Sequence, residues 1–458
     1  MKKYSCQLVL FSLLFIFSCA SHVPRRAEVL FFGTGNEKAS NQATWLSVAL
    51  FSKGINLTYS QDLLDMNANY LAKFDAVVLQ VKDQKLSGEQ EQSLHDFVKN
   101  GGGLIALNRA GNSFLQTPWY ADLVRGGFSD LGEGAGSVTF ADSNAVVGLQ
   151  VPDIAIAHEN YSFKAPIAEF TTLGTASVAG KSEVYLWSTE VGKGRFYYNA
   201  LGKEDDTWKN LSFLNQLREA VWWSLGAEVQ QLVSELNIPD VSIYPDSLAD
   251  FTARYDVPRV QDPLAPAEAM KLIQTPVDFE LKLFAAEPDI VNPIAMSWDE
   301  RGRLWVIETI DYPNSFEERK GEGRDRIKIC EDTDGDGVAD KFTVFADKLN
   351  IATSLVFMNG GVLVAMAPNF VFYKDTDGDD VADHEEVLMT GWSKGDTHAG
   401  PSNLQYGFDN KIWGVTGYAG FDGTIAGEKH IFGQGLYRFK PDGSDFEYLA
   451  TTSNNTWG

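Results

Sequence analysis

The chain has 458 residues, a formal charge of −24 and a hydrophobic fraction of 44%, which suits two or three soluble domains. So large an excess of acid argues against nucleic acid as a partner, because phosphate contacts need clusters of Lys and Arg. The same excess leaves two interpretations open, general solubility or cation binding by groups of Asp.

The N-terminus has the pattern of a bacterial secretion signal. Lys2 and Lys3 precede an apolar run, Leu8 to Phe17, that is too short to cross a bilayer. The run ends at Ile16-Phe17-Ser18-Cys19, which resembles a lipobox. We therefore expect residues 1–18 to be a lipoprotein signal peptide and Cys19 to carry the lipid. A plain secretory signal is the alternative.

This signal predicts a location in the cell envelope, in the periplasm or on the outer-membrane surface, with membrane contact through the lipid anchor only. Later in the sequence, no run of 18 apolar residues follows. Removal of residues 1–18 would leave Cys330 as the one free thiol, so no intramolecular disulfide is expected.

Strand and helix patterns alternate through residues 27–228. Short apolar runs at 28–32, 76–81 and 104–107 are typical of buried strands. Ser87 to Gln90 has the pattern of a capping box that opens a helix, and Gly101 to Gly103 ends it. This order predicts an α/β domain, an open parallel sheet with helices on both faces.

Three stretches of this domain resemble the trehalose-utilisation (ThuA-like) family, whose fold is shared with class I glutamine amidotransferases. They are the helix-to-strand passage Phe97–Leu104, the segment Gly192–Tyr198 and the closing Ala220–Trp223. The resemblance implies the fold over about 200 residues and a role in carbohydrate metabolism.

The chemistry implied by that resemblance is incomplete in this sequence. Amidotransferases place a nucleophilic Cys on a sharp turn after the strand that corresponds to Leu104–Leu107, where this chain has Asn108-Arg109-Ala110 and no Cys in the domain. His158 is the one His in an informative place, and it can be catalytic or structural. We predict a sugar-binding or scaffolding role with Arg109, His158 and Trp208 in the cleft.

Residues 229–276 have the composition of a linker. Six Pro residues between positions 239 and 276 and several Asp break regular structure, with one short helix expected near Pro266–Ile273. The linker separates the first domain from residues 277–458.

An internal repeat dominates residues 277–458. The segment Asp332–Asp340 recurs as Asp375–Asp383, 43 residues later, and strand-like runs flank both copies. A third hairpin turns at Pro441–Gly443, and Gly or Asn turns precede further apolar strands. Antiparallel strands at this spacing predict the blades of an all-β propeller.

The repeated acidic loops have two interpretations. Carboxylates at alternate loop positions resemble an EF-hand-type Ca²⁺ loop without its helices. The alternative is a pair of solvated turns, because Asp-Gly is favoured for backbone reasons alone. The predicted metal ligands are Asp332, Asp334, Asp336 and Asp340 in the first loop and Asp375, Asp377, Asp379 and Asp383 in the second.

This second region resembles the propeller of quinoprotein dehydrogenases of the glucose/sorbosone type, in the putative membrane-bound dehydrogenase family. The matching residues are Ala285–Pro288, Gly302–Glu308, both acidic loops and His398–Asp409. The resemblance implies oxidation of a sugar or polyol with pyrroloquinoline quinone as cofactor and a cytochrome as electron acceptor. No haem motif is present in this chain.

The same resemblance implies that His398 is the general base on the sugar hydroxyl, which an imidazole titrating near neutrality suits. Two departures stand out. His398 lies one residue further from Leu404 than in the pattern, and Gly417-Tyr418 stands where the pattern ends in Gly-Asp. A structural His in a loop is the alternative.

Residues 277–458 suffice for three or four blades, whereas this dehydrogenase type has six, so we expect a truncated propeller. Three functions stay open: an envelope lipoprotein with a quinone-dependent sugar or polyol dehydrogenase, a glycan-binding surface lipoprotein without turnover, or a scaffold in a larger complex.

Overall fold

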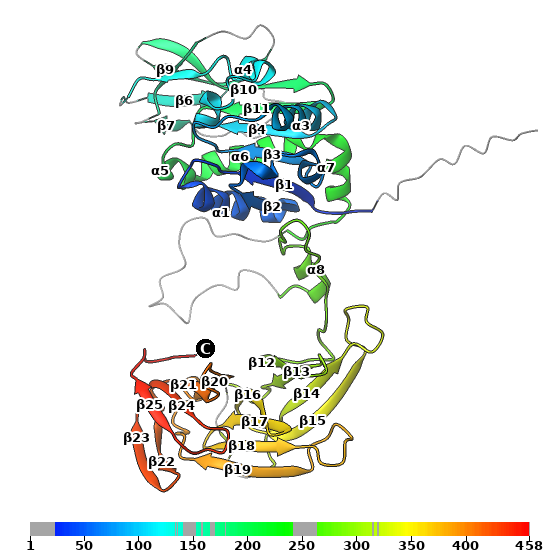
Figure 1. Ribbon diagram of the computed structural model, residues 1–458, viewed down its shortest axis with the longest axis vertical. Coiled ribbons are helices and arrows are strands. Elements are labelled where there is room, and N and C mark those ends of the chain that lie inside the picture. Colours follow the sequence, from blue (N-terminus) through cyan, green and yellow to red (C-terminus); the bar gives the residue numbers. More distant parts are fainter. Residues whose placement is uncertain are drawn as a thin grey trace, which may run out of the picture. The chain divides into compact units, whose positions relative to one another are not determined.

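The computed structural model describes residues 23–132, 134, 136–140, 153–156, 159–164, 170–178, 180–240, 263–313, 316–317 and 320–457. The predicted signal peptide, Cys19 and His158 lie outside these residues. The chain divides into two compact units, Met1–Leu281 and Lys282–Gly458 (Figure 1). No helix of the described residues combines the length and apolar character needed to cross a membrane.

The first unit is an α/β domain built on a nine-stranded sheet with the order β2-β1-β3-β4-β11-β10-β9-β6-β7. Five neighbouring strands are parallel, and their apolar residues are buried on both faces, as sequence runs without alternation predict. These strands are β1 (Ala27–Phe32), β2 (Ile55–Ser60), β3 (Ala76–Leu79), β4 (Gly103–Leu107) and β11 (Gly194–Asn199).

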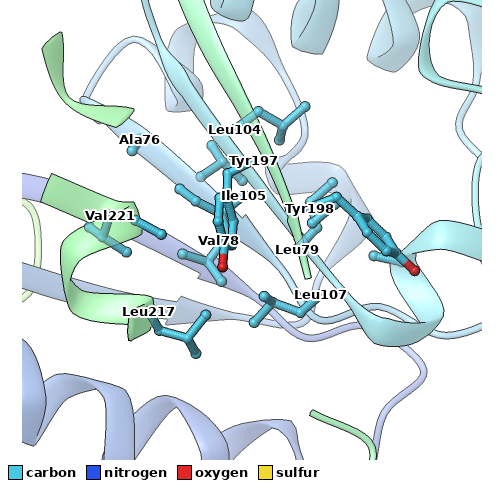
Figure 2. Packing of buried hydrophobic residues seen from close by; sticks show 14 of the residues in the cluster. Ala76, Val78, Leu79, Leu104, Ile105, Leu107, Tyr197, Tyr198, Leu217 and Val221 are labelled. Atoms are coloured by element: carbon cyan, nitrogen blue, oxygen red, sulfur yellow. The ribbon is translucent and has the colours of Figure 1, made fainter. Parts of the chain in front are cut away.

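Helices α1 (Ala39–Leu50), α3 (Gly88–Lys99) and α6 (Leu211–Ser224) pack on this parallel half. The capping box predicted at Ser87 and Gln90 opens α3. Figure 2 shows Leu217 and Val221 of α6 packed against sheet residues that include Val78 and Ile105.

The other half of the sheet is antiparallel, which the prediction of a parallel sheet did not include. It comprises β10 (Lys181–Val191), β9 (Thr171–Val178), β6 (Gly136–Phe140) and β7 (Ile154–Ile156). The cause is local: Gly192 has a φ of +64° and makes a tight hairpin with Lys193, and a hairpin forces antiparallel pairing.

The segment between the domains is partly packed on the first unit. After α7 (Gly226–Ser234), the helix predicted near residue 266 is α8 (Pro266–Met270). Gln274 then donates to Ile55 O at 2.7 Å, and the Val277 N–H donates to Thr58 Oγ1 at 2.9 Å. The unit boundary therefore follows Leu281, rather than residue 276 as the composition suggested.

The second unit is rich in strands and contains three four-stranded antiparallel sheets and a two-stranded one, β22 (Phe421–Ile425) with β23 (Glu428–Phe432). The first sheet is β12 (Pro293–Trp298), β13 (Leu304–Glu308), β14 (Asp325–Glu331) and β15 (Lys341–Leu349). The second is β16 (Ala352–Met358), β17 (Gly361–Met366), β18 (Asn369–Lys374) and β19 (His384–Thr390). The third is β20 (Pro401–Tyr406), β21 (Ile412–Thr416), β24 (Gly435–Phe439) and β25 (Glu447–Ala450).

The three larger sheets meet through their first strands, because β12 contacts β16 and β16 contacts β20. Thr353 of β16 donates to Pro401 O at 2.6 Å, and Ser354 Oγ accepts from the Leu404 N–H at 2.8 Å. A cavity of about 500 Å³ lies along these first strands.

Strand direction places the predicted sites of this unit at opposite ends of its sheets. The acidic loops follow β14 and β18, whereas His398 packs against Tyr312, in the loop before β14. The two ends of β14 are about 20 Å apart, given about 3.3 Å per residue. We call these the acidic-loop end (332–340 and 375–383) and the histidine end (309–313 and 391–400).

Candidate functional site

A crevice of about 330 Å³ lies at the carboxyl edge of the parallel strands in the first unit. In open α/β sheets this edge is the usual ligand position, beside the point where strand order reverses, here between β1 and β3. The residues that line it follow β1, β3, β4 and β11: Gly35, Asn36, Glu37, Lys38, Gln80, Val81, Lys82, Asn108, Arg109, Lys203 and Glu204. We call this the carboxyl-edge crevice.

Asn108 occupies the sharp turn after β4, where the amidotransferase resemblance expects a nucleophile. Its φ is +43°, and its side chain is buried. The amide donates to Tyr161 OH at 2.9 Å and to Ala200 O at 2.7 Å, while Asn108 O accepts from Tyr198 OH at 2.9 Å. The strained turn is thus kept, but its side chain braces β11 and carries no nucleophile.

Hydrogen bonds among three side-chain amides, those of Asn36, Gln42 and Gln80, support the crevice from the protein core. Gln80 Nε2 donates to Gln42 Oε1 at 3.0 Å and to Gly202 O at 2.7 Å, and Asn36 Nδ2 donates to Gln42 Oε1 at 3.1 Å. Gln42 is fully buried, and its Nε2 has no partner among the described residues. These contacts fix Asn36 and Gln80 at the mouth of the crevice.

Glu159 holds the wall that carries Lys203 and Glu204. Its buried carboxylate accepts from the backbone N–H of Gly202, Lys203 and Glu204 at 3.0–3.1 Å and from Thr207 Oγ1 at 3.0 Å. Burial raises the pKa of Glu159, and these hydrogen bonds oppose that rise. No sequence pattern indicates this role, except that Glu159 follows His158.

The rim of the crevice is charged. Arg109 lies 3.7 Å from Asp130, and Lys38 lies 3.7 Å from both Glu204 and Asp205. These separations exceed direct hydrogen-bond length, and Arg109 remains 35% exposed. Such groups can exchange their present contacts for the hydroxyl groups of a ligand.

The three predicted cleft residues have different outcomes. Arg109 lines the crevice, as expected, and His158 lies outside the described residues. Trp208 of α5 (Asp205–Trp208) is fully buried instead: its ring packs on Phe31 and Phe213, and its Nε1 donates to Gly202 O at 2.8 Å. Trp208 therefore supports the crevice wall from the core and has no surface for a ligand.

In the second unit, His398 is exposed at the histidine end. Its Nδ1 lies 3.1 Å from Asp396 Oδ1, and its ring packs edge-on against Tyr312 with centroids 5.1 Å apart. Asp396 also accepts a hydrogen bond from Tyr418 OH. Asp396, Tyr312 and Tyr418 were not predicted, although Asp396 lies only two positions before His398.

The acidic loops bring together some of their predicted ligands. Carboxylate oxygens of Asp332, Asp334 and Asp340 lie within 4.8 Å of one another, as do those of Asp375, Asp377 and Asp379. Asp336 and Asp383 stay outside these groups and bond within their loops: Asp336 accepts from the Val338 N–H, and Asp383 accepts from Thr376.

The first carboxylate of each loop organises the backbone around it. Asp332 accepts from the N–H of Gly335, Asp336 and Gly337, which lowers the pKa of Asp332. Asp375 does the same in the second loop. The pKa of Asp377 is raised, chiefly by the neighbouring charge of Asp379. Clustered oxygen ligands of this kind suit a hard cation such as Ca²⁺.

Comparisons with known proteins, like the structure, divide the chain into an N-terminal and a C-terminal part. Residues 28–224 match the family model described as trehalose utilisation (ThuA), and residues 265–458 match a model described as a domain of unknown function (DUF7133). No curated protein matches the chain.

Similar solved structures cover the first unit. A ThuA-like protein from Parabacteroides merdae has 16% identity and a TM-score of 0.38, covering 44% of this chain and 90% of its own. A ThuA-like protein from Bacteroides uniformis has 15% identity and a TM-score of 0.39, covering 44% and 92%. A cytoplasmic protein from Salmonella typhimurium has 12% identity and a TM-score of 0.32, covering 43% and 98%.

Three observations agree on the same stretch of chain. The family model matches it, the mixed α/β sheet is built from it, and the motif glycines lie within it. Gly192 and Gly194 lie where a Cβ would meet the end of α3, at Lys99 O and Val98 O, which accounts for the Gly-Lys-Gly segment. Residues 28–224 form a ThuA-like domain.

Proposed function

We propose that the carboxyl-edge crevice binds a small carbohydrate or polyol, as part of an envelope lipoprotein of carbohydrate metabolism. The observation that carries this proposal is the lining itself: amides and charged groups at the ligand edge of a ThuA-like sheet. Among the residues that line the crevice in the described structure there is no Cys, Ser, Thr or His. The lining therefore suits recognition of hydroxyl groups and lacks the nucleophile needed for acyl transfer.

The size of the crevice limits the ligand. Its volume of about 330 Å³ lies at the lower end of the range for small-molecule pockets, which suits one or two sugar rings. Asn36 Oδ1 keeps a lone pair beyond its contact with the Lys38 N–H, and Arg109 offers donors that can bind vicinal hydroxyls, whereas Gln80 is buried and shapes the wall.

Isothermal titration of the protein with trehalose, glucose, sorbitol and gluconate tests this proposal. We expect binding of at least one ligand, and we expect Arg109→Ala and Asn36→Ala to weaken it at least tenfold. Lys193→Ala is the matched control, since Lys193 is exposed at the opposite edge of the same sheet. Binding unchanged in Arg109→Ala and Asn36→Ala would place the ligand elsewhere.

As a second function, we propose that the second unit removes the proton of a sugar or polyol hydroxyl, with His398 as the base, within a propeller. The order of strands within the sheets and the contacts among β12, β16 and β20 support successive blades with their first strands innermost. The contact between His398 and Asp396 supports the base.

The quinone predicted from the resemblance carries three carboxylates, so its site would need Arg or Lys side chains to bind them. Lys394 lies four residues before His398, and Arg324 directly precedes β14 at the same end of the sheet, but Arg324 is bonded to Asp311 and Lys394 lies over Phe316. The described residues therefore do not fit that cofactor, and the proposal is limited to the base. Oxidation of a panel of sugars, with an added dye as the two-electron acceptor for the hydride, tests it, and activity retained in His398→Gln would contradict it.

A further inference from the structure

We propose that Asp396 is a positioning residue that fixes the His398 ring with its proton on Nδ1, leaving Nε2 free as the base, and that Tyr418 holds Asp396 in place. The inference deepens the second proposed function and rests on it for its biological meaning. Its geometry and its test do not depend on turnover.

One carboxylate oxygen makes both contacts to the histidine. Asp396 Oδ1 accepts from the backbone N–H of His398 at 2.6 Å and lies 3.1 Å from His398 Nδ1. A carboxylate is an acceptor only, so the Nδ1 that faces it must carry the proton. The neutral imidazole then has its lone pair on Nε2, which is the atom a general base uses.

The second carboxylate oxygen is bound by a residue from another loop. Tyr418, after β21, donates its hydroxyl to Asp396 Oδ2. With one oxygen on His398 and the other on Tyr418, the carboxylate is held at both ends. The hydrogen bond from Tyr418 is the largest cause of a lowered pKa for Asp396, so the group stays ionised at neutral pH.

Among the described residues, Tyr312 and Thr397 also hold the histidine loop, and neither contact involves Nε2. Tyr312 packs edge-on against the ring, and Thr397 Oγ1 donates to Pro313 O at 3.4 Å. Thr397 Oγ1 also lies 3.4 Å from His398 Nδ1, on the same side as Asp396. The side chain of His398 is 55% exposed, so a ligand can reach it.

This arrangement accounts for a departure noted in the sequence. The pattern implied by the resemblance ends in Gly-Asp, where this chain has Gly417-Tyr418. Tyr418 supplies no carboxylate at that place, but it anchors one supplied by Asp396. The histidine end thus contains a carboxylate, a histidine and a tyrosine from two loops.

Two-bond ¹H–¹⁵N spectra of the full chain labelled with ¹⁵N-histidine test the proposal. We expect the neutral form of His398 to carry its proton on Nδ1. In Asp396→Asn this preference should be lost, because an amide facing Nδ1 can donate as well as accept a hydrogen bond. In Tyr418→Phe the low-pH inflection that reports Asp396 should move to higher pH.

The control is the other histidine–carboxylate pair of this unit. His384 Nε2 lies 3.8 Å from Glu386 Oε2, so Glu386→Gln should change the His384 signals and leave those of His398 unchanged. A wild-type His398 protonated on Nε2, or a tautomer preference that is the same in Asp396→Asn, would overturn the proposal. Because these spectra need no substrate, a negative dye-reduction assay would refute the second function and leave this result intact.

Discussion

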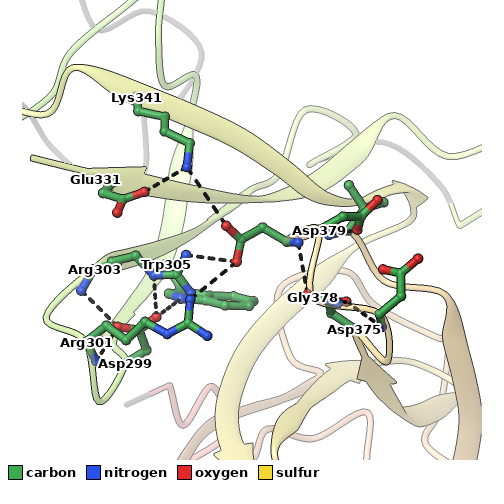
Figure 3. A network of polar contacts seen from close by, with 12 residues as sticks. Asp299, Arg301, Arg303, Trp305, Glu331, Lys341, Asp375, Gly378 and Asp379 are labelled. Atoms are coloured by element: carbon green, nitrogen blue, oxygen red, sulfur yellow. Dashed lines mark hydrogen bonds and ion pairs between the residues drawn. The ribbon is translucent and has the colours of Figure 1, made fainter. Parts of the chain in front are cut away.

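Arg303 NH1 lies 2.9 Å from Asp380 Oδ1, and this contact joins the second acidic loop to the first sheet of the second unit. Figure 3 shows Arg303 and the loop residues Gly378 and Asp379. Asp380 stands where the first loop has Gly337, and both residues have a positive φ, +66° and +89°. Asp380 therefore adopts a backbone conformation that favours Gly, and its side chain gains an ion pair. Arg303 also binds Asp299 at 2.8 Å and is nearly buried.

Replacing Arg303 should unfold the second unit more easily. Arg303→Met removes the buried ion pairs of Arg303 with Asp299 and Asp380, and we expect a loss of about 2–3 kcal/mol in the free energy of unfolding. Arg301→Met is the control: Arg301 is 66% exposed and 3.9 Å from Asp380, so its loss should cost under about 0.5 kcal/mol. Urea denaturation measures both, and equal effects would show that burial does not matter here.

The effect of Arg303→Met should depend on pH. Burial raises the pKa of Asp299, but hydrogen bonds from Trp305 and Arg303 outweigh burial and lower it below the ordinary value. A carboxyl with a depressed folded pKa stabilises the fold above its unfolded pKa, about 3.9, and that stability is lost as pH falls through the folded value. The difference between wild type and Arg303→Met should therefore shrink below about pH 4.

Millimolar Ca²⁺ should raise the melting temperature of the second unit. At a hundred times the dissociation constant, binding to the folded state alone adds about 2.7 kcal/mol, and Mg²⁺ should do less because it resists dehydration. The double variant Asp334→Asn, Asp377→Asn should lose most of the effect, whereas Asp347→Asn, outside the loops, should retain it. An identical midpoint in Ca²⁺ and in chelator would show that the loops are acidic turns only.

Glu159→Gln should destabilise the ThuA-like domain and weaken ligand binding in the crevice. The amide replaces one acceptor oxygen by a donor that faces backbone N–H groups, at an expected cost of about 2–4 kcal/mol. Glu183→Gln is the control, because Glu183 accepts from Ser162 at a half-buried position. Calorimetry of the full chain gives the transition of this domain, and a midpoint unchanged by Glu159→Gln would contradict the assigned role.

Gly194→Ala should destabilise the same domain by about 2 kcal/mol or more. A Cβ at Gly194 would lie 2.0 Å from Val98 O and 2.5 Å from Gly102 O, both backbone atoms that cannot move without shifting α3. Gly88→Ala, at the start of α3 with nothing within 4 Å, should be neutral. Thermal melts of the two variants make the comparison.

Lipidation of Cys19 remains a prediction from the sequence. Mass spectrometry of the mature protein from a bacterial host should find Cys19 as a lipid-modified N-terminal residue, and Cys19→Ala should release the protein from the membrane fraction. An unmodified N-terminus at another residue would contradict the lipobox.

Much of the fold follows from sequence patterns with a local cause. The buried strands at 28–32 and 104–107, the capping box at Ser87 and the acidic hairpin loops all depend on neighbours within a few residues. The antiparallel half of the first sheet was not predicted. Its pairing depends on hairpin turns at Gly180 and Gly192, and the strands that these turns connect have mixed polarity, so they lack the apolar pattern of a buried strand.

The site was harder to predict, because its contacts join distant segments. Arg109 was found from its place after a strand, but Glu159 contacts residues 43 to 48 positions away. Trp208 was predicted in the cleft, but it is buried, and its Nε1 donates to Gly202 O in the core.

The separation of the acidic-loop end from the histidine end determines how mutations at the two ends combine in their effect on stability. Sites about 20 Å apart that share no contact partners contribute additively to stability, within a few tenths of a kcal/mol. A chain carrying both Asp334→Asn and Asp396→Asn should therefore show the sum of the two separate effects. Residues at one end of these sheets can therefore be substituted during evolution without changing what residues at the other end contribute to stability.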